Sequence, residues 1–259
     1  MSSSSTVTTT LARGLQVLRA FRATRLPLTN AELVRRTGLS RSSVSRFTNT
    51  LVNLGYLRRA SGGPEFELAW GGFALGYAYA KTNPVTQLAH PLMQRLADRL
   101  DVTVALAVPD RLDMLYIGYC SSQRIATLRL DVGSLLPMGR TSVGRAWLGA
   151  SPLRQRKRYL VEILQAAGPE AEALKQRIEA AFDDLRATGV CMVVNEYQRN
   201  TYGIALPVRV GRSRVLMALS CGAADPAPDV AAIRSRVVPE LKSAAQELKA
   251  LLRRVDAEP

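Results

Sequence analysis

Apolar side chains recur every three to four residues near the start of the chain, which is the spacing of amphipathic helices. In residues 11–23 the pattern runs through Leu15, Leu18 and Phe21, and it predicts a first helix. The segment before it, "MSSSSTVTTT", is polar and of low complexity. We therefore expect residues 1–10 to form a disordered tail.

Two further helices are indicated by their end signals. Thr29 and Glu32 have the spacing of a capping box, and Gly38 is a typical stop, so a second helix is predicted over residues 30–37. A serine then caps a third helix, over residues 41–54. Two helices joined by a short turn that contains glycine are typical of a helix-turn-helix.

The third predicted helix has one apolar face and one purely polar face. Its apolar side chains lie at helical spacing and should pack against the first two helices; they are Val44, Phe47, Leu51 and Leu54. The other face holds serine, arginine and asparagine without any acidic residue. These side chains can bond to DNA base edges and phosphates. The alternative is an ordinary solvated helix face.

A short basic hairpin follows the three helices. Residues 56–59 and 65–69 are typical of β-strands and flank the turn-forming "ASGGP". Three helices and such a hairpin make a winged helix-turn-helix, which we place at residues 11–69. Its candidate DNA contacts are Arg13, Thr29, Ser40, Arg41, Ser42, Ser43, Ser45, Arg46, Asn49, Arg58 and Arg59.

The next segment is predicted to be a linker helix. Residues 70–83, "WGGFALGYAYAKTN", are rich in aromatic and apolar side chains. This is too much apolar surface for a free spacer, so we expect the helix to pack against another subunit or the next domain.

Residues 84–259 have the pattern of an α+β domain. Helices are predicted over residues 85–100, 152–164, 169–187 and 229–255, with one more in "MGRTSVGRAWLGAS". Strands are predicted twice within residues 102–120, once over 125–137, and three times within 190–222. Strands in series favour an antiparallel sheet with helices packed on it.

The charge of the chain indicates an anionic partner. The net charge of the 259 residues is +14, and residues 1–80 hold 10 basic and 3 acidic side chains, a net +7. Such an excess favours nucleic acid, a membrane surface or an acidic ligand. The alternative is an arginine-rich proteome without functional meaning. Because no apolar run approaches the roughly 18–20 residues that span a bilayer, and the start does not resemble a signal peptide, we expect a cytoplasmic protein without a membrane partner.

Cysteine and histidine usage gives little support for a metal or catalytic centre. Cys120, Cys191 and Cys221 are far apart and form no C-x-x-C pair. The single histidine, His90, is expected on a packed helix. No metal, cofactor or enzymatic activity is therefore predicted.

Four segments resemble the IclR family of bacterial transcription regulators. They are "TLARGLQVLRAF", "AELVRRTGLSRSSVSRFTNTLVNLGYLRR", "DVGSLLPMGRTSVGRAWLGA" and "IALPVRVGRSRVLMALSCG", in the family's order. The resemblance implies a GAF-like effector-binding and oligomerisation domain over residues 84–259. It also implies homodimers or dimers of dimers on an inverted-repeat operator of double-stranded DNA, regulated by a small organic acid. The run "LGYAYAKTNPVTQLAHPLMQRLADRL" is most similar to members that control aromatic-acid catabolism.

The resemblance also shows where this chain departs from the family. Members often carry Glu, three residues and then Gly before a strand with "A-x-P-V"; here the same stretch runs from Glu196 to Asn200. Asparagine tolerates a left-handed backbone better than other non-glycine residues, so the turn is expected to survive. Some members place an aspartate, a cysteine and two serines at the positions of Val193, Gly203, Leu219 and Cys221. The resemblance therefore implies a less polar pocket here.

The stretch "LPMGRTSVG" predicts an anion site. A strand, Gly139 and a helix that begins near Thr141 would direct free backbone N–H groups toward one point, and a helix N-terminus binds anions. The backbone of Ser142 and Val143, with the hydroxyls of Thr141 and Ser142, would hold a carboxylate. Arg140 lies beside them, and Met138, Val193, Gly203, Leu219 and Cys221 would line the apolar part. The alternative is that Thr141 only caps its helix.

Three functions are compatible with these features. A ligand-responsive transcription regulator accounts for most of them. An enzyme with a DNA-binding anchor would rest on Glu196 and His90 alone, which no evident partner activates. A constitutive DNA-binding protein, whose large domain only oligomerises, is the remaining candidate.

Overall fold

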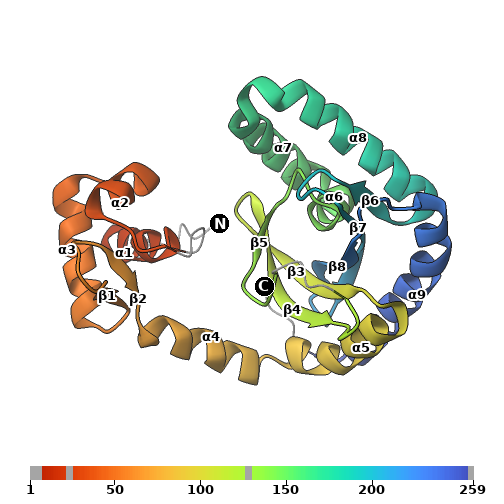
Figure 1. Ribbon diagram of the computed structural model, residues 1–259, viewed down its shortest axis with the longest axis horizontal. Helices are drawn as coiled ribbons and strands as arrows, with labels where there is room; N and C mark the ends of the chain where they lie inside the picture. Colours follow the sequence, from red (N-terminus) through yellow and green to blue (C-terminus); the bar gives the residue numbers. More distant parts are fainter. Residues whose placement is uncertain (1–7, 22–25, 126–129, 256–259) are drawn as a thin grey trace, which may run out of the picture. The chain divides into compact units, whose positions relative to one another are not determined.

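The computed structural model describes residues 8–21, 26–125 and 130–255, and the chain divides into two compact units, residues 1–82 and 83–259. The fold is α+β, as the sequence predicts. The elements of the first unit are α1 (Thr9–Arg19), α2 (Asn30–Thr37), α3 (Arg41–Asn53), β1 (Leu57–Arg59), β2 (Phe66–Leu68) and α4 (Trp70–Thr82) (Figure 1).

Local hydrogen bonds explain where α2 begins and ends. The Thr29 hydroxyl accepts a hydrogen bond from the backbone amide of Glu32 at 3.2 Å, and Gly38 follows the helix with a left-handed backbone at φ +68°. These observations confirm the predicted start and stop. The capping box is only half formed, because the Glu32 carboxylate pairs with Arg35 and Arg36 instead.

The hairpin is fixed to the helices by backbone pairing. β1 and β2 are antiparallel, with Arg58 opposite Glu67. Leu28, just before α2, exchanges two backbone hydrogen bonds of 2.9 Å with Phe66. The wing is therefore held against the helix-turn-helix by its own core, which consists of Val17, Phe21, Leu28, Leu33, Val44, Phe47, Leu51, Leu57 and Phe66.

Two boundaries in this unit differ from the prediction. The first helix begins at Thr9 and ends at Arg19, so the predicted tail is too long at its end; residues 1–7 and the predicted helix end at 22–23 lie outside the described residues. The apolar face of α3 does not extend to Leu54, which is 64% exposed. The reason is that α3 ends at Asn53, and Leu54 is the cap residue.

The aromatic surface of α4 is exposed. Trp70 and Phe73 are 84% and 68% exposed, and the rings of Phe73 and Tyr77 stack with their centroids 5.9 Å apart. No residue of α4 is buried within the described chain. The start of the helix lies close to the wing, because the Gly71 amide donates to the Gly55 carbonyl at 3.0 Å.

The second unit is a six-stranded antiparallel sheet between two layers of helices. Its strands lie in the order β5-β4-β3-β8-β7-β6. The elements are α5 (Pro84–Leu100), β3 (Thr103–Asp110), β4 (Asp113–Ser121), β5 (Leu135–Pro137), α6 (Ser142–Ala150), α7 (Leu153–Ala167), a 3₁₀ turn η1 (Gly168–Glu170), α8 (Ala171–Thr188), β6 (Cys191–Val194), β7 (Thr201–Val210), β8 (Val215–Ala224) and α9 (Val230–Leu251).

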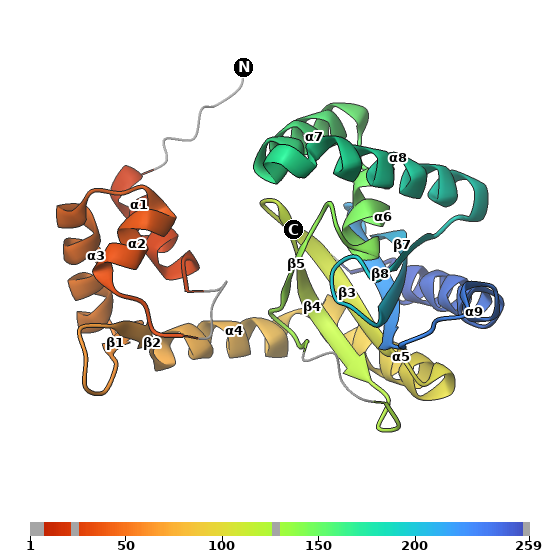
Figure 2. The same cartoon turned by 45° about the horizontal axis from the view of Figure 1, so that its top comes forward.

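Each face of this sheet has its own core. Helices α5 and α9 cover one face, and α6 with α7 and α8 lies on the other (Figure 2). Successive residues of a strand point to opposite faces. On β7, Ile204 therefore belongs to the α5/α9 core and Ala205 to the α6 core. The pocket described below lies on the α6 side.

The strand predicted over residues 125–137 is mostly wrong. Only Leu135–Pro137 forms β5, and Leu130 lies outside any strand. Leu128, on which the prediction also rested, is not among the described residues. Pro169 lies in η1, so α8 begins two residues later than predicted.

The described residues include neither a membrane-spanning helix nor a candidate metal site. Every helix there is too short or too polar to cross a bilayer. In the same ranges, no three His, Cys, Asp or Glu side chains gather where they could hold a metal ion.

Candidate DNA interface and ligand pocket

One side of α3 is polar and open to solvent. Val44, Phe47 and Leu51 are buried in the core of the first unit. The opposite side presents Arg41, Ser42, Ser45, Arg46 and Asn49, of which only Ser45 is half-buried. The Arg46 guanidinium carbon lies 5.6 Å from the centroid of the Phe47 ring, which is a cation–π contact.

Several of the other candidate DNA contacts have structural partners of their own. The Ser40 hydroxyl accepts from the Ser43 amide at 3.3 Å, so Ser40 caps α3 as Thr29 caps α2. In the wing, Arg58 pairs with Glu67 at 2.9 Å. The Arg59 guanidinium lies 5.0 Å from the Phe66 ring centroid. Arg13 is exposed on α1.

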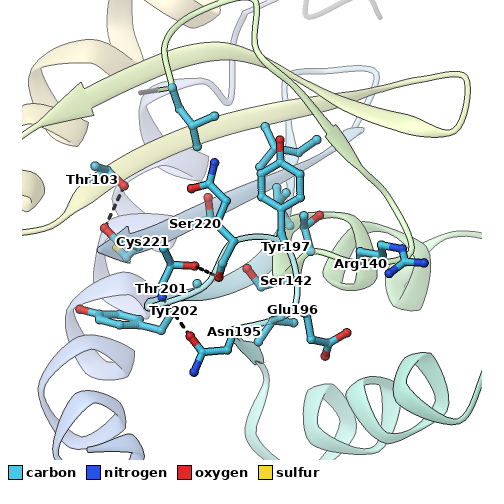
Figure 3. A pocket seen from close by; sticks show the side chains of 18 of the residues that line it. Thr103, Arg140, Ser142, Asn195, Glu196, Tyr197, Thr201, Tyr202, Ser220 and Cys221 are labelled. Atoms are coloured by element: carbon cyan, nitrogen blue, oxygen red, sulfur yellow. Dashed lines mark hydrogen bonds between the residues drawn. The ribbon is translucent and has the colours of Figure 1, made fainter. Parts of the chain in front are cut away.

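The second unit contains a pocket at the start of α6. Its cavity volume is about 60 Å³, below the roughly 300–1,000 Å³ that is usual for small-molecule sites, and it opens to solvent. Figure 3 shows Ser142, Tyr197 and Ser220 around the same space, with Arg140 to one side. Part of its wall is backbone, because Gly203 on β7 pairs with Gly222 on β8.

The α6 N-terminus supplies two free backbone donors to this pocket. The Thr141 hydroxyl donates to the Pro137 carbonyl at 2.9 Å and accepts from the Gly144 amide at 3.3 Å. Thr141 therefore caps its helix, as the alternative interpretation holds. The amides of Ser142 and Val143 have no acceptor in the described chain, and both residues line the pocket.

The structure gathers seven of the nine predicted effector residues around the pocket. They are Arg140, Thr141, Ser142, Val143, Val193, Gly203 and Cys221. Cys221 borders the pocket, but its side chain lies in the α5/α9 core on the opposite face of the sheet. Leu219 is wrong, because it points to the opposite face of the sheet and is buried against α5 and α9. Met138 is also wrong, because the chain turns after β5 and its side chain enters the core beneath α6.

The pocket is more polar than the resemblance implies. Ser220 rather than Leu219 faces it, since neighbours on a strand alternate. Sequence patterns do not identify, as a group, the polar lining residues Thr103, Tyr116, Asn195, Glu196, Tyr197, Gln198, Thr201, Tyr202 and Ser220. Alternation along β8 could have identified Ser220, but nothing local marks Thr103, which lies more than 100 residues earlier in the chain.

Burial keeps the Tyr116 phenol and the Cys221 thiol protonated. Desolvation raises the pKa of the Tyr116 phenol well above its usual range, so it remains neutral at physiological pH. Burial also raises the pKa of the Cys221 thiol to about 12. A neutral thiol is a poor nucleophile. The Cys221 side chain is packed in the core between the sheet and α5/α9, on the face opposite α6.

The loop between β6 and β7 is held by a buried ion pair. Arg145, only 2% exposed, donates to both carboxylate oxygens of Glu196 at 2.8 and 2.5 Å. Its Nε also donates to the Gly139 carbonyl at 2.9 Å, and Arg177 approaches Glu196 at 3.2 Å. Asn200, at the end of the loop, has φ +57°, which confirms that asparagine supports the left-handed turn.

Glu196 and His90, the two residues on which an enzymatic role would rest, both contact other side chains. Both carboxylate oxygens of Glu196 are engaged by arginines, so this carboxylate is not poised as a general base. The Nδ1 atom of His90 lies 3.1 Å from the Cys120 sulfur. Burial raises the pKa of that thiol to about 11.

We expect the Arg145–Glu196 pair to contribute to the free energy of unfolding. Glu196→Ala leaves a buried guanidinium without its counter-ion, so it should lower the free energy of unfolding by about 3 kcal/mol. Arg145→Met removes the buried charge itself, so it should lower the free energy of unfolding by less than Glu196→Ala does. The double variant should be more stable than Glu196→Ala alone. Urea denaturation of the three variants and the wild type measures this; additive losses from the two single changes would show that the groups are not coupled.

Comparison with known proteins identifies the family of both units. The IclR helix-turn-helix domain matches residues 10–61, and the family described as bacterial transcriptional regulator IclR C-terminal matches residues 77–250. The Pca regulon regulatory protein of Pseudomonas putida is 31% identical, over 93% of this chain and 82% of that protein.

Solved structures agree with this assignment. The crystal structure of an IclR family transcriptional regulator from Brucella abortus has a TM-score of 0.87 and 32% identity, over 96% of this chain and 94% of that one. An IclR homologue from Microbacterium hydrocarbonoxydans, complexed with 4-hydroxybenzoate, shares the fold with a TM-score of 0.66 and 24% identity, over 94% and 99% of the two chains. The chain therefore belongs to the IclR family of bacterial transcription regulators, and it is a DNA-binding regulator with an N-terminal helix-turn-helix.

Proposed function

We propose that this regulator responds to a small aromatic carboxylate held in the pocket at the start of α6. The observation that carries the proposal is the pair of free amide donors at Ser142 and Val143, two residues that line this pocket. An anion there gains two hydrogen bonds and the favourable end of the helix dipole. The ligand then alters operator affinity through its different affinity for two states of the protein.

The remaining walls favour a flat body with polar substituents. Val143 and Val193 supply apolar contacts, and the paired Gly203 and Gly222 leave a stretch of backbone without side chains. A ring can approach such a surface closely. Ser220 and the other hydroxyl and amide groups would then bond to substituents on the ring. The homologue complexed with 4-hydroxybenzoate makes that compound a reasonable first probe.

The nearest cation does not dominate this site. Arg140 borders the pocket, but its guanidinium is paired with Glu170 at the end of η1. Glu170 therefore largely compensates the charge of Arg140. Because the Arg140 side chain is also exposed to solvent, screening reduces its remaining attraction for a carboxylate. We therefore assign the primary carboxylate contact to the backbone amides rather than to Arg140.

A proline at position 142 isolates the amide contribution. Ser142 is the first residue of α6, where proline is well tolerated, and Thr141 before it has the extended backbone that proline requires. Ser142→Pro should abolish binding of 4-hydroxybenzoate, whereas Ser142→Ala, which keeps the N–H, should retain most of it. Calorimetry on both variants, with thermal unfolding as the control for folding, measures the difference. Wild-type affinity in Ser142→Pro would place the carboxylate elsewhere.

If the wild type binds neither 4-hydroxybenzoate nor other small acids in a thermal-shift screen, the constitutive alternative is favoured. In that case the large domain would serve oligomerisation alone.

We also propose that the polar side of α3 reads the major groove, with Arg58 and Arg59 on phosphates. Arg46 is exposed near the middle of α3, and the ring of Phe47 restrains it. Arg46→Ala should therefore weaken operator binding by about 1–3 kcal/mol and relax sequence preference at one position. Gel-shift titrations measure this, with Lys242→Ala in the other unit as the control for charge. Equal operator affinity in wild type and Arg46→Ala would rule out this placement.

A homodimer on an inverted repeat is the proposed assembly. Two-fold dimers place equivalent recognition helices about one turn of DNA, roughly 34 Å, apart or a multiple of that distance. The exposed aromatic side chains of α4 offer surface for a second subunit. Light scattering at micromolar concentration should give at least twice the mass of one chain without DNA, and Phe73→Glu should lower it. A wild type with the mass of one chain would contradict the proposal.

A further inference from the structure

Three arginine-rich segments of the effector domain contain no acidic residue. They are residues 150–158, 209–214 and 253–255. Their basic side chains are Arg154, Arg156, Lys157, Arg158, Arg209, Arg212, Arg214, Arg253 and Arg254. All except Arg156 are exposed. We call this set the arginine end.

Hydrogen bonds between the segments place them together. The Arg209 guanidinium donates to the Ala150 carbonyl at 3.0 Å, which joins the β7–β8 hairpin to the end of α6 and the start of α7. The Arg212 amide donates to the Val255 carbonyl at 3.1 Å, which joins the same hairpin to the chain after α9. The closed end of the hairpin therefore lies between the other two segments.

The arginine end accounts for the whole positive excess of its domain. Residues 81–259 hold 25 basic and 18 acidic side chains, a net +7. Without the nine residues of the arginine end, 25 − 9 = 16 basic side chains face 18 acidic ones, a net −2. Positive charge is thus concentrated at one end of the domain instead of being spread over its surface.

The basic side chains at the start of α7 repel one another and the positive end of the helix dipole. Four basic residues lie in the first two turns, next to the positive end of the helix dipole, and the first turn has no acidic residue. The nearest acid on the helix, Glu162, reaches Arg158 only at 4.0 Å. Asp110 and Asp113, which end β3 and begin β4, are acidic residues of the neighbouring hairpin. An anionic partner would offset this repulsion.

We propose that the arginine end binds the sugar–phosphate backbone of DNA that flanks the operator. Guanidinium groups match phosphate geometry, and contacts to phosphates need no base sequence. Double-stranded DNA is the anion that a regulator of this family already holds through its first unit. The contact would add to operator affinity by releasing counter-ions.

The test removes one charge from each segment. The patch variant carries Lys157→Gln, Arg214→Gln and Arg253→Gln. The control variant removes the same charge from elsewhere on the domain, with Lys175→Gln, Arg199→Gln and Lys242→Gln. Both full-length proteins are titrated by fluorescence anisotropy, over a range of salt concentrations, with a short duplex of the operator alone and a long duplex with about 30 base pairs on either side.

The patch variant should bind the long duplex at least about tenfold more weakly than the control variant, and its slope of log affinity against log salt should be shallower by about two to three units. On the short duplex the two variants should agree. Agreement on both duplexes would overturn the proposal and favour an acidic protein as the partner of this surface. An equal loss on both duplexes would overturn the assignment to flanking DNA.

Discussion

A single buried guanidinium joins the two segments that form the ligand pocket. Arg145, inside α6, bonds to the carbonyl of Gly139 in the turn before that helix and to Glu196 in the loop after β6. The turn brings the free amides of Ser142 and Val143 into place. The loop supplies the opposite wall through Asn195, Glu196 and Tyr197. If this cation were unpaired, its desolvation would disfavour the folded arrangement of both walls.

Close packing also restricts the turn at Gly139 and the first residues of α6. A side chain on Gly144 would place its Cβ only 2.1 Å from the Met138 carbonyl oxygen. On the pocket side, a Cβ on Gly203 would lie 2.8 Å from the Ser142 hydroxyl. The start of α6 is therefore positioned by backbone contacts and by one ion pair. This rigidity suits a site whose main donors are amide groups, because a small displacement would misalign both hydrogen bonds.

The sequence predicts local structure well where signals are local. Thr29, Gly38 and Ser40 determine the ends of α2 and α3 through bonds within four residues, and all three behave as expected. Asn200 likewise supports its turn. Predictions of which side chains meet across the sheet were less successful. Leu219 and Ser220 differ only in the face to which they point, and that depends on pairing with β3 and β7. The Arg145–Glu196 pair spans 51 residues, and no pattern near either residue indicates it.

The backbone at the start of α6 is proposed to hold the carboxylate of an effector. A crystal structure of the complex with 4-hydroxybenzoate tests it most directly. We expect the carboxylate oxygens within about 2.7–3.2 Å of the amide nitrogens of Ser142 and Val143, with the ring beside Gly203. A ligand whose carboxylate binds Arg140 instead, with water on both amides, would contradict the account.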